Sequence, residues 1–215
     1  MKILLLDNYD SFTYNLAHYL RELTVEYIDV IRNDQITIDE VDAYDAIVLS
    51  PGPGLPKDAG IMPEVIRKYS PTKKILGVCL GMQAIGEAFG GTLLNLPSVF
   101  HGVATTATIL QTDEVLFRDL PSKIEVGRYH SWVVDETKLP SDLEITATDA
   151  TGRIMALRHK KLDVRGVQFH PESVLTPHGK TMISNWLDNP RLNPGDDQRA
   201  RGSLSNPRLQ YGDYR

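Results

Sequence analysis

Residues 75–83 read Ile-Leu-Gly-Val-Cys-Leu-Gly-Met-Gln and join a short apolar run to a helical pattern. The first four residues predict a buried strand, while Met82, Ile85 and Phe89 recur at the spacing of one helix face. Cys79 therefore falls at a strand-to-helix turn. A strand followed by a helix is the unit from which parallel sheets are built, so this segment predicts an α/β protein.

The turn around Cys79 has the composition of a nucleophile elbow. Gly77 and Gly81 lack the Cβ atoms that would crowd a tight turn whose central residue is strained. Such a turn is expected to expose the thiol at the carboxyl end of the strand. There the thiol would lie near the amino terminus of the next helix, where free N–H groups and the helix dipole favour the thiolate. We expect Cys79, the only cysteine in the chain, to be a partly activated nucleophile.

Residues 163–172, Asp-Val-Arg-Gly-Val-Gln-Phe-His-Pro-Glu, supply the candidate partners of this cysteine. They predict a strand that ends in a histidine and a carboxylate two residues apart. Side chains at i and i+2 of an extended segment point the same way, so Glu172 could orient His170 while the other ring nitrogen faces Cys79. Pro171 favours an extended conformation, because it biases its predecessor away from helix. The three side chains would be nucleophile, base and orienter.

Other interpretations of these residues are weaker. A lone cysteine is most often a small buried hydrophobe. The His-x-Glu spacing also occurs in zinc deaminases, but those need further cysteines that this chain lacks. A metal site built from His159, His170 and His178 would lack close ligand spacing, so we expect no metal here. The cysteine and histidine motifs together, each at a predicted strand end, favour covalent catalysis.

Strand and helix patterns alternate through the first half of the chain, as in parallel βαβ units. Strands are predicted at residues 2–6, 26–31, 46–49 and 74–78, and helices at 13–23, 62–69 and 82–89. After residue 92, short strands are predicted at 105–110, 143–148, 154–158 and 164–169, and a last helix at 179–187. The expected fold is a single α/β domain with a mainly parallel central sheet flanked by helices, plus a smaller mixed or antiparallel sheet.

The expected domain spans residues 1–189, and residues 190–215 differ from it in composition. This C-terminal tail is rich in proline, glycine and charged residues, and it has few aliphatic side chains. Alone it could not bury enough apolar surface to fold. We expect it to be flexible or docked on a surface.

Composition limits the partners and the compartment. The net charge of −5 and the low isoelectric point argue against nucleic acid or an anionic membrane as a partner. A single cysteine rules out an internal disulfide and suits a reducing cytoplasm. Asp7 and Asp10 interrupt the apolar start before the hydrophobic region of a signal peptide can form. No segment approaches the roughly 20 apolar residues of a membrane span.

Two motifs together resemble a known family. Residues 77–83, Gly-Val-Cys-Leu-Gly-Met-Gln, and residues 168–172, Gln-Phe-His-Pro-Glu, are similar to the class I (triad) glutamine amidotransferases, whose fold is flavodoxin-like. Three further segments resemble more narrowly the glutaminase components of anthranilate synthase and of aminodeoxychorismate (para-aminobenzoate) synthase: Leu-Leu-Asp-Asn-Tyr-Asp-Ser-Phe-Thr-Tyr-Asn-Leu at 5–16, Leu-Ser-Pro-Gly-Pro-Gly at 49–54 and Arg-Tyr-His-Ser at 128–131. The resemblance covers the whole expected domain.

The resemblance implies a reaction. Cys79 would attack the side-chain amide of L-glutamine, His170 would give a proton to the departing ammonia and later activate water, and Glu172 would hold the imidazole. A γ-glutamyl thioester would form and then be hydrolysed to glutamate. In relatives, backbone N–H groups stabilise the oxyanion, and here they would come from Leu80 and from the Pro-Gly-Pro-Gly loop.

The resemblance also implies which residues hold glutamine. By themselves residues 51–54 would be an ordinary tight turn, and they lack the pattern of a phosphate-binding loop. Gln83 would lie on the first turn of the helix after Cys79, facing either the site or solvent. His130 is expected to be structural or at the rim, and His101 is given no role. The predicted glutamine and oxyanion residues are Gly52, Pro53, Gly54, Leu80, Gln83, Ser131 and Trp132.

The implied function is that of a glutamine amidotransferase subunit. It would supply ammonia to a separate chorismate-using synthase large subunit in a hetero-oligomer, making anthranilate for tryptophan biosynthesis, aminodeoxychorismate for folate biosynthesis, or both. No cofactor is expected in this chain, whereas the partner synthase would need Mg²⁺. Two alternatives stay open. The intact triad argues against a non-catalytic regulatory subunit, and Gln83 with the Pro-Gly-Pro-Gly loop argues against a peptidase or other cysteine hydrolase.

Overall fold

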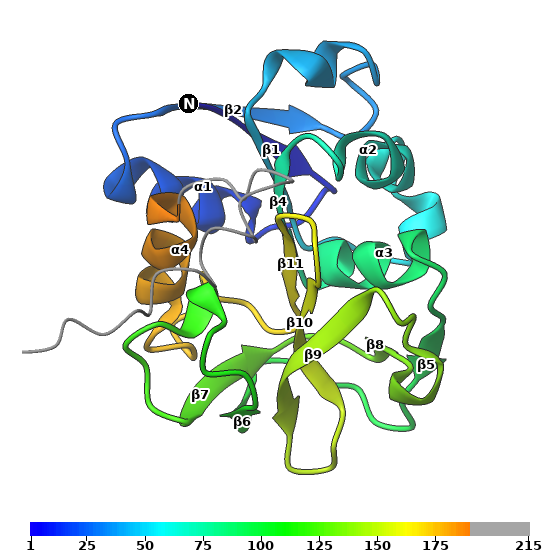
Figure 1. Cartoon of the computed structure of the whole chain (residues 1–215), viewed down its shortest axis with the longest axis vertical. Coiled ribbons are helices and arrows are strands. Elements are labelled where there is room, and N and C mark those ends of the chain that lie inside the picture. Colours follow the sequence, from blue (N-terminus) through cyan, green and yellow to red (C-terminus); the bar gives the residue numbers. More distant parts are fainter. Residues whose placement is uncertain (190–215) are drawn as a thin grey trace, which may run out of the picture.

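The computed structural model describes residues 1–189 and arranges them around a nine-stranded sheet with helices on both faces (Figure 1). The strand order is β2-β1-β3-β4-β11-β10-β9-β6-β7. The predicted tail at 190–215 lies outside the described residues. The α/β class with a largely parallel centre is thereby confirmed.

One half of the sheet is parallel. It consists of β1 (Lys2–Asp7), β2 (Tyr27–Arg32), β3 (Ala46–Leu49), β4 (Lys74–Val78) and β11 (Val164–Val167). β3, β4 and β11 are buried along their whole length, as expected for strands that helices cover on both sides. Because parallel strands end at the same edge of a sheet, the segments that follow β1, β3, β4 and β11 meet there.

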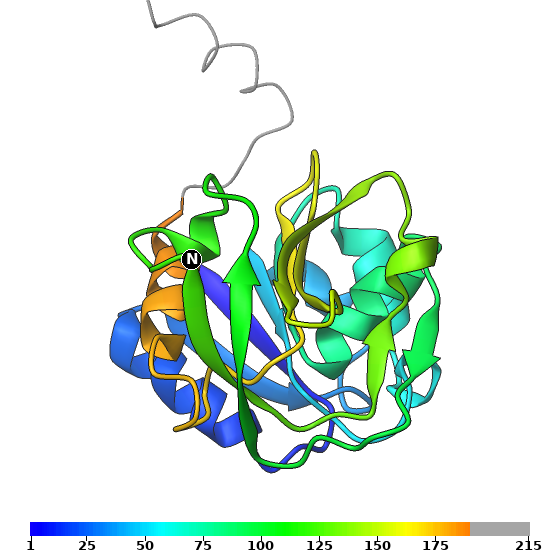
Figure 2. The same cartoon turned by 90° about the horizontal axis from the view of Figure 1, so that it is seen from below.

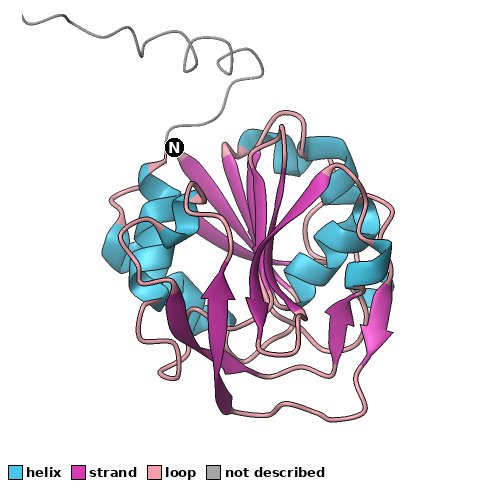
Figure 3. Ribbon diagram, turned by 60° about the horizontal axis from the view of Figure 1, so that its bottom comes forward, coloured by secondary structure: helices cyan, strands magenta, loops and turns pink. Residues whose placement is uncertain are grey.

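Two helices pack on each face. Figure 2 shows α1 (Thr13–Leu23) beside α4 (Gly179–Asp188) on one side, with α2 (Met62–Tyr69) and α3 (Leu80–Ala88) on the other. Side chains along β1 alternate between the two cores, since Ile3 and Leu5 pack toward α1 and α4, whereas Leu4 and Leu6 pack toward α2 and α3. Figure 3 shows these layers with the sheet between them.

The other half of the sheet is antiparallel. Its strands are β10 (Ile154–His159), β9 (Leu143–Asp149), β6 (Val103–Ile109) and β7 (Lys123–Arg128). They continue the central sheet, because β11 pairs in parallel with β4 on one edge and antiparallel with β10 on the other. The separate small sheet is only the antiparallel pair β5 (Leu93–Asn95) and β8 (Trp132–Val134).

Differences from the predicted elements are local. Helix α3 begins at Leu80, directly after the cysteine, and not at Met82. Strands β5, β7 and β8 were not predicted, since β5 and β8 are very short and β7 has only two large apolar residues and contains Gly127. The 3₁₀ helices are Glu40–Ala43, Pro56–Asp58, Val115–Phe117 and Glu136–Lys138. Within residues 1–189, no helix has the length and apolar character needed to span a membrane.

Candidate active site

Cys79 forms the turn between β4 and α3. Its backbone angles, φ 51° and ψ −100°, lie in a region that residues other than glycine rarely adopt. A Cβ at Gly77 would lie 2.5 Å from the carbonyl carbon of Gly81, and a Cβ at Gly81 would lie 2.6 Å from the carbonyl oxygen of Leu49. Both positions need glycine for α3 to begin this close to the sheet. The predicted strained elbow is confirmed.

The thiol is less exposed than the sequence predicts. Cys79 is only 6% exposed, and it lines a cavity of about 200 Å³, here called the Cys79 cavity. The backbone N–H of Cys79 donates to Val167 O at 2.8 Å, and its carbonyl accepts from the N–H of Gln83 at 3.1 Å. The nucleophile is therefore fixed to β11 on one side and to the first turn of α3 on the other.

His170 and Glu172 lie next to this elbow, just beyond β11. His170 Nδ1 and Glu172 Oε1 are 2.7 Å apart, and both residues are buried. The segment that holds them is not extended, as the sequence suggested, but a turn closed by the N–H of Ser173 donating to His170 O at 3.1 Å. Pro171 suits the second position of such a turn, where its fixed φ is favoured. The carboxylate therefore reaches the imidazole by turning back on it.

Two neighbouring aromatic rings pack against the imidazole. The ring centroids of Phe12 and Tyr129 lie 5.2 Å and 4.8 Å from that of His170. The Tyr129 hydroxyl is 3.1 Å from Ser173 Oγ, which ties this ring to the histidine turn. These contacts and the Glu172 bond restrict the rotation of His170. Its Nε2 atom is buried with no hydrogen-bond partner and is the nitrogen left free for proton exchange.

The electrostatics of His170 favour its charged form. Burial lowers the pKa of His170, but its interactions with Cys79 and Glu172 outweigh burial and raise that pKa from 6.5 to about 10. A histidine with a pKa this high is protonated at neutral pH. An imidazolium in this place can donate a proton to a leaving group.

The Pro-Gly-Pro-Gly loop that follows β3 lies across from the elbow. Asn8, after β1, fixes the start of this loop, because its Nδ2 donates to Ser50 O at 2.9 Å and its backbone N–H donates to Ser50 Oγ at 2.8 Å. A Cβ at Gly52 would lie 2.7 Å from the backbone oxygen of Asn8 and 2.8 Å from Leu80 Cδ2. The loop is thus held in place by close backbone packing.

All seven residues predicted to bind glutamine or its oxyanion line the Cys79 cavity with the nucleophile. They come from the loop after β3, from the start of α3 and from the start of β8. The remaining lining residues are Val99, Phe100, His101, Tyr129 and His130. The geometry brings the predicted set together, and the individual roles stay predictions.

Gln83 and Trp132 meet through a side chain and a carbonyl. Gln83 is 3% exposed, so the solvent-facing alternative is wrong, and its Nε2 donates to Trp132 O at 2.8 Å. The size of the tryptophan side chain does not disturb this contact, since the backbone makes it. His130 Nδ1 lies 3.0 Å from the same oxygen.

His130 is more than a rim residue. Arg128 Nε donates to His130 Nε2 at 3.1 Å, and a guanidinium can only donate. His130 is therefore the tautomer that carries its proton on Nδ1. Burial, followed by the charge of Arg128, lowers the pKa of His130 to about 3, so the ring is neutral. His130 supports the cavity wall and cannot serve as an acid near neutral pH.

Comparison with known proteins identifies the family of this chain. The family model described as "Glutamine amidotransferase class-I" matches residues 4–189. The chain belongs to the class-I glutamine amidotransferases. The resemblance inferred from its motifs is confirmed.

Relatives of this class-I glutamine amidotransferase fall in two named groups. Aminodeoxychorismate synthase component 2 of Escherichia coli is 46% identical over 86% of this chain and 98% of its own length. Anthranilate synthase component 2 of Azospirillum brasilense is 46% identical over 88% of this chain and 96% of its own length. Longer relatives match in part, and the chain spans 32% of the bifunctional protein TrpGD of Thermotoga maritima.

Solved structures give the same fold. A protein from Thermoplasma acidophilum assigned to GMP synthase superposes with a TM-score of 0.78 at 28% identity, over 94% of this chain and 97% of that one. A glutamine amidotransferase from Thermotoga maritima has a TM-score of 0.67 at 14% identity, over 87% of this chain and 96% of that one, and shows the fold alone.

Sequence reasoning missed three residues of this amidotransferase site. Phe12 and Tyr129 lie within the family motifs, but nothing local shows that they contact His170. Gln168 drew attention only as part of a motif, and it lies beside Cys79. In the described part of the chain, no group of three histidine, cysteine or acidic side chains is placed to hold a metal ion.

Proposed function

We propose that this chain hydrolyses L-glutamine through Cys79 and passes the ammonia to a chorismate-using synthase on a separate chain. The observation that carries the proposal is that Cys79, in a strained elbow and next to the bonded His170 and Glu172, lines the same cavity as every predicted glutamine residue. Family membership and the names of the two groups of relatives support the same interpretation.

The proposed reaction starts from the thiolate of Cys79, whose proton has moved to His170 Nε2. Sγ attacks the side-chain carbonyl carbon of glutamine, and the oxyanion is stabilised by the N–H of Leu80 and by N–H groups of the Pro-Gly-Pro-Gly loop. His170 donates its proton to the amide nitrogen, the C–N bond breaks, and ammonia leaves. Glu172 keeps the imidazole oriented throughout.

The second half of the reaction restores the enzyme. Neutral His170 takes a proton from water, which attacks the γ-glutamyl thioester, and the C–S bond breaks to release glutamate and the thiolate. In this proposal the chain itself needs no cofactor or metal, and the partner synthase binds chorismate and Mg²⁺. A single buried thiol that must stay reduced suits the cytoplasm.

The pathway is proposed as anthranilate synthesis for tryptophan, with aminodeoxychorismate synthesis for folate as the second candidate. Relatives named for both are 46% identical to this chain, so a role shared between the two partners is equally compatible with the comparisons.

The test is glutamate release from glutamine by the purified chain, with and without each candidate synthase large subunit. Cys79→Ala should lower release at least about 1,000-fold, and Cys79→Ser, the closest match in shape, should lower it nearly as much. Stimulation by one partner names the pathway. Release that survives Cys79→Ala would refute the mechanism, and absence of release with either partner would favour a non-catalytic subunit.

A further inference from the structure

Gln168 lies against the nucleophile. It follows β11 directly, is fully buried, and its Nε2 lies 3.6 Å from Cys79 Sγ as a hydrogen-bond donor. The contact comes from the sheet itself, since the N–H of Cys79 donates to Val167 O at 2.8 Å and so brings the next residue beside the thiol. The triad mechanism gives this side chain no role.

The direction of this hydrogen bond follows from the Trp132 carbonyl, an acceptor that is linked to Gln168 through the side chain of Gln83. Trp132 O is a backbone carbonyl, so the group 2.8 Å from it on Gln83 must be the NH₂. That NH₂ has a second hydrogen, which it donates to Gln168 Oε1 at 3.3 Å. With its oxygen turned to Gln83, Gln168 presents its own NH₂ to the sulfur.

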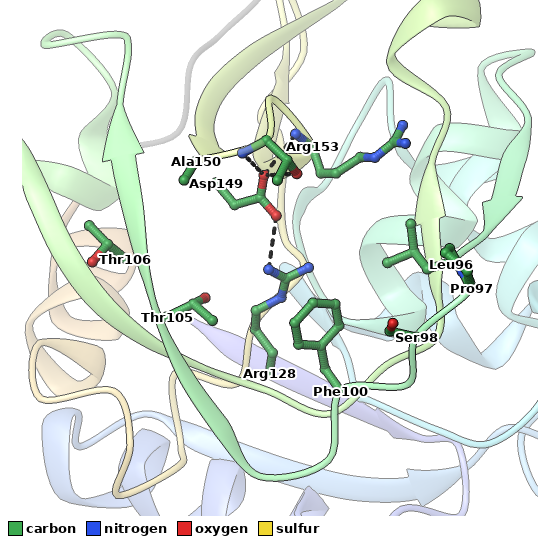
Figure 4. Close-up of a pocket in the computed structure, with 11 residues that line it drawn as sticks. Leu96, Pro97, Ser98, Phe100, Thr105, Thr106, Arg128, Asp149, Ala150 and Arg153 are labelled. Atoms are coloured by element: carbon green, nitrogen blue, oxygen red, sulfur yellow. Dashed lines mark hydrogen bonds and ion pairs between the residues drawn. The ribbon is translucent and has the colours of Figure 1, made fainter.

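A buried ion pair lies at the far end of this series of hydrogen bonds from Cys79. Arg128 Nη1 and Asp149 Oδ2 are 2.8 Å apart, and the Phe100 ring centroid lies 3.6 Å from the guanidinium carbon (Figure 4). Figure 4 shows the guanidinium held between the carboxylate and the ring, at the wall of a second cavity. Arg128 in turn fixes the tautomer of His130, whose Nδ1–H points to Trp132 O. Each donor in this series of hydrogen bonds, from Arg128 to Gln168, therefore has one orientation.

We propose that Gln168 is a catalytic residue, whose side-chain N–H stabilises the Cys79 thiolate and whose orientation is set by Gln83 and the Trp132 carbonyl. The inference rests on Cys79 being the nucleophile. A hydrogen bond to a charged acceptor is stronger than one to a neutral acceptor. The bond therefore strengthens when the thiol proton moves to His170 and weakens when the thioester forms. It strengthens again as the C–S bond breaks, which makes the sulfur a better leaving group.

The charged groups around Cys79 are few, so the contribution of Gln168 can be separated from theirs. His170, with Glu172 behind it, is the titrating neighbour. His130 lines the same cavity but is neutral, and Arg128 is neutralised by its ion pair. His101 and Tyr129 are the other titratable side chains that line this cavity. Removing the Gln168 N–H leaves all of these groups in place.

The experiment follows the rate of Cys79 alkylation by iodoacetamide as a function of pH, together with kcat and KM for glutamine. Gln168→Met keeps the length of the side chain and removes the N–H. We expect the pH midpoint of alkylation to rise by about one unit, because hydrogen bonds to charged groups are worth about that much. We also expect kcat to fall about tenfold, while KM changes less than about threefold.

Further variants keep the test decisive. Gln168→Glu sets a carboxylate against the sulfur and should raise the midpoint at least as far. Gln83→Met leaves Gln168 in place but frees its amide to turn, so it should give a smaller rise in the same direction. Thr146→Val, a shape-matched change at a fully buried residue of β9, is the control and should give no shift.

An unshifted midpoint in the folded Gln168 and Gln83 variants would overturn the inference. If the Gln168 amide had only a structural role, its variants would be less stable to urea, but the pH midpoint of Cys79 alkylation would be that of the wild type. If alkylation of the wild-type chain at Cys79 leaves glutaminase activity intact, the proposed nucleophile is wrong, and that result is distinct from an unshifted midpoint.

Discussion

Gly77→Ala should displace the nucleophile without touching any chemical group of the site. The new Cβ would lie 2.5 Å from the carbonyl carbon of Gly81, 2.6 Å from its oxygen and 2.7 Å from Ile85 Cδ1. The first two atoms are backbone at the start of α3, so no side-chain rotation relieves the clash. The first turn of the helix must move away from β4, and it carries Cys79 with it.

The size of this movement sets the expected effect. Bringing the closest approach to an ordinary contact of 3.4 Å requires a shift of about 0.9 Å. A misplacement of about 1 Å at a reacting group can cost about 100-fold in rate. Overpacking of this kind costs about 1–3 kcal/mol in the free energy of unfolding. We expect Gly77→Ala to fold, with a kcat for glutamine about 100-fold below wild type.

The assay combines urea denaturation with glutaminase kinetics. Gly90→Ala is the control, because Gly90 lies just after the other end of α3 and has a φ of +99°, but its Cβ would meet no atom within 4 Å. It should lose about 1 kcal/mol through backbone strain and keep its kcat. A Gly77→Ala protein with wild-type kcat would show that close packing at Gly77 is not what positions Cys79 for reaction.

Two further predictions concern charge. The pKa of His170 is about 10 in the folded chain against an ordinary 6.5, so its stabilising contribution is complete below pH 6.5 and is lost as pH rises through 10. Glu172→Gln should lower the midpoint of the His170 titration followed by NMR. In urea denaturation, the loss of stability with rising pH should become smaller. An unchanged titration midpoint would contradict the role of Glu172 in raising the pKa of His170. Asp149→Asn leaves Arg128 buried without its countercharge and should lower the free energy of unfolding by about 3 kcal/mol, whereas a change below about 1 kcal/mol would contradict a strong ion pair.

The parts of the site that depend on local sequence could be predicted. Cys79 between two glycines specifies its turn within a few residues, and the positive φ and the close approaches follow from that spacing. The contact between His170 and Glu172 was predicted because the two residues are near neighbours, although the backbone that joins them was not. A turn and an extended strand can both bring together side chains two residues apart, so the contact did not distinguish them.

The parts that depend on pairing between distant strands could not be predicted. The ion pair between Arg128 and Asp149 joins β7 to β9, two strands that lie on either side of β6, and no local pattern fixes that arrangement. The exposure of Cys79 was overestimated for the same reason. The cavity that Cys79 lines includes residues from the start of β8, a strand too short to show a period.

The register between β4 and β11 depends both on local sequence and on the pairing of strands that are distant in the chain. Val167 pairs with Val78, so the residues that follow, Gln168 and Cys79, emerge side by side at the same edge of the sheet. A slip of one residue would place the apolar Phe169 against the sulfur and turn Gln168 to the opposite face. Gly166, which pairs with Gly77, protects this register, because a Cβ there would lie 2.6 Å from Met82 Cγ and 3.1 Å from Met82 Cα at the start of α3. The same glycine pair that lets the elbow helix lie close to the sheet therefore also selects the side chain that meets the nucleophile.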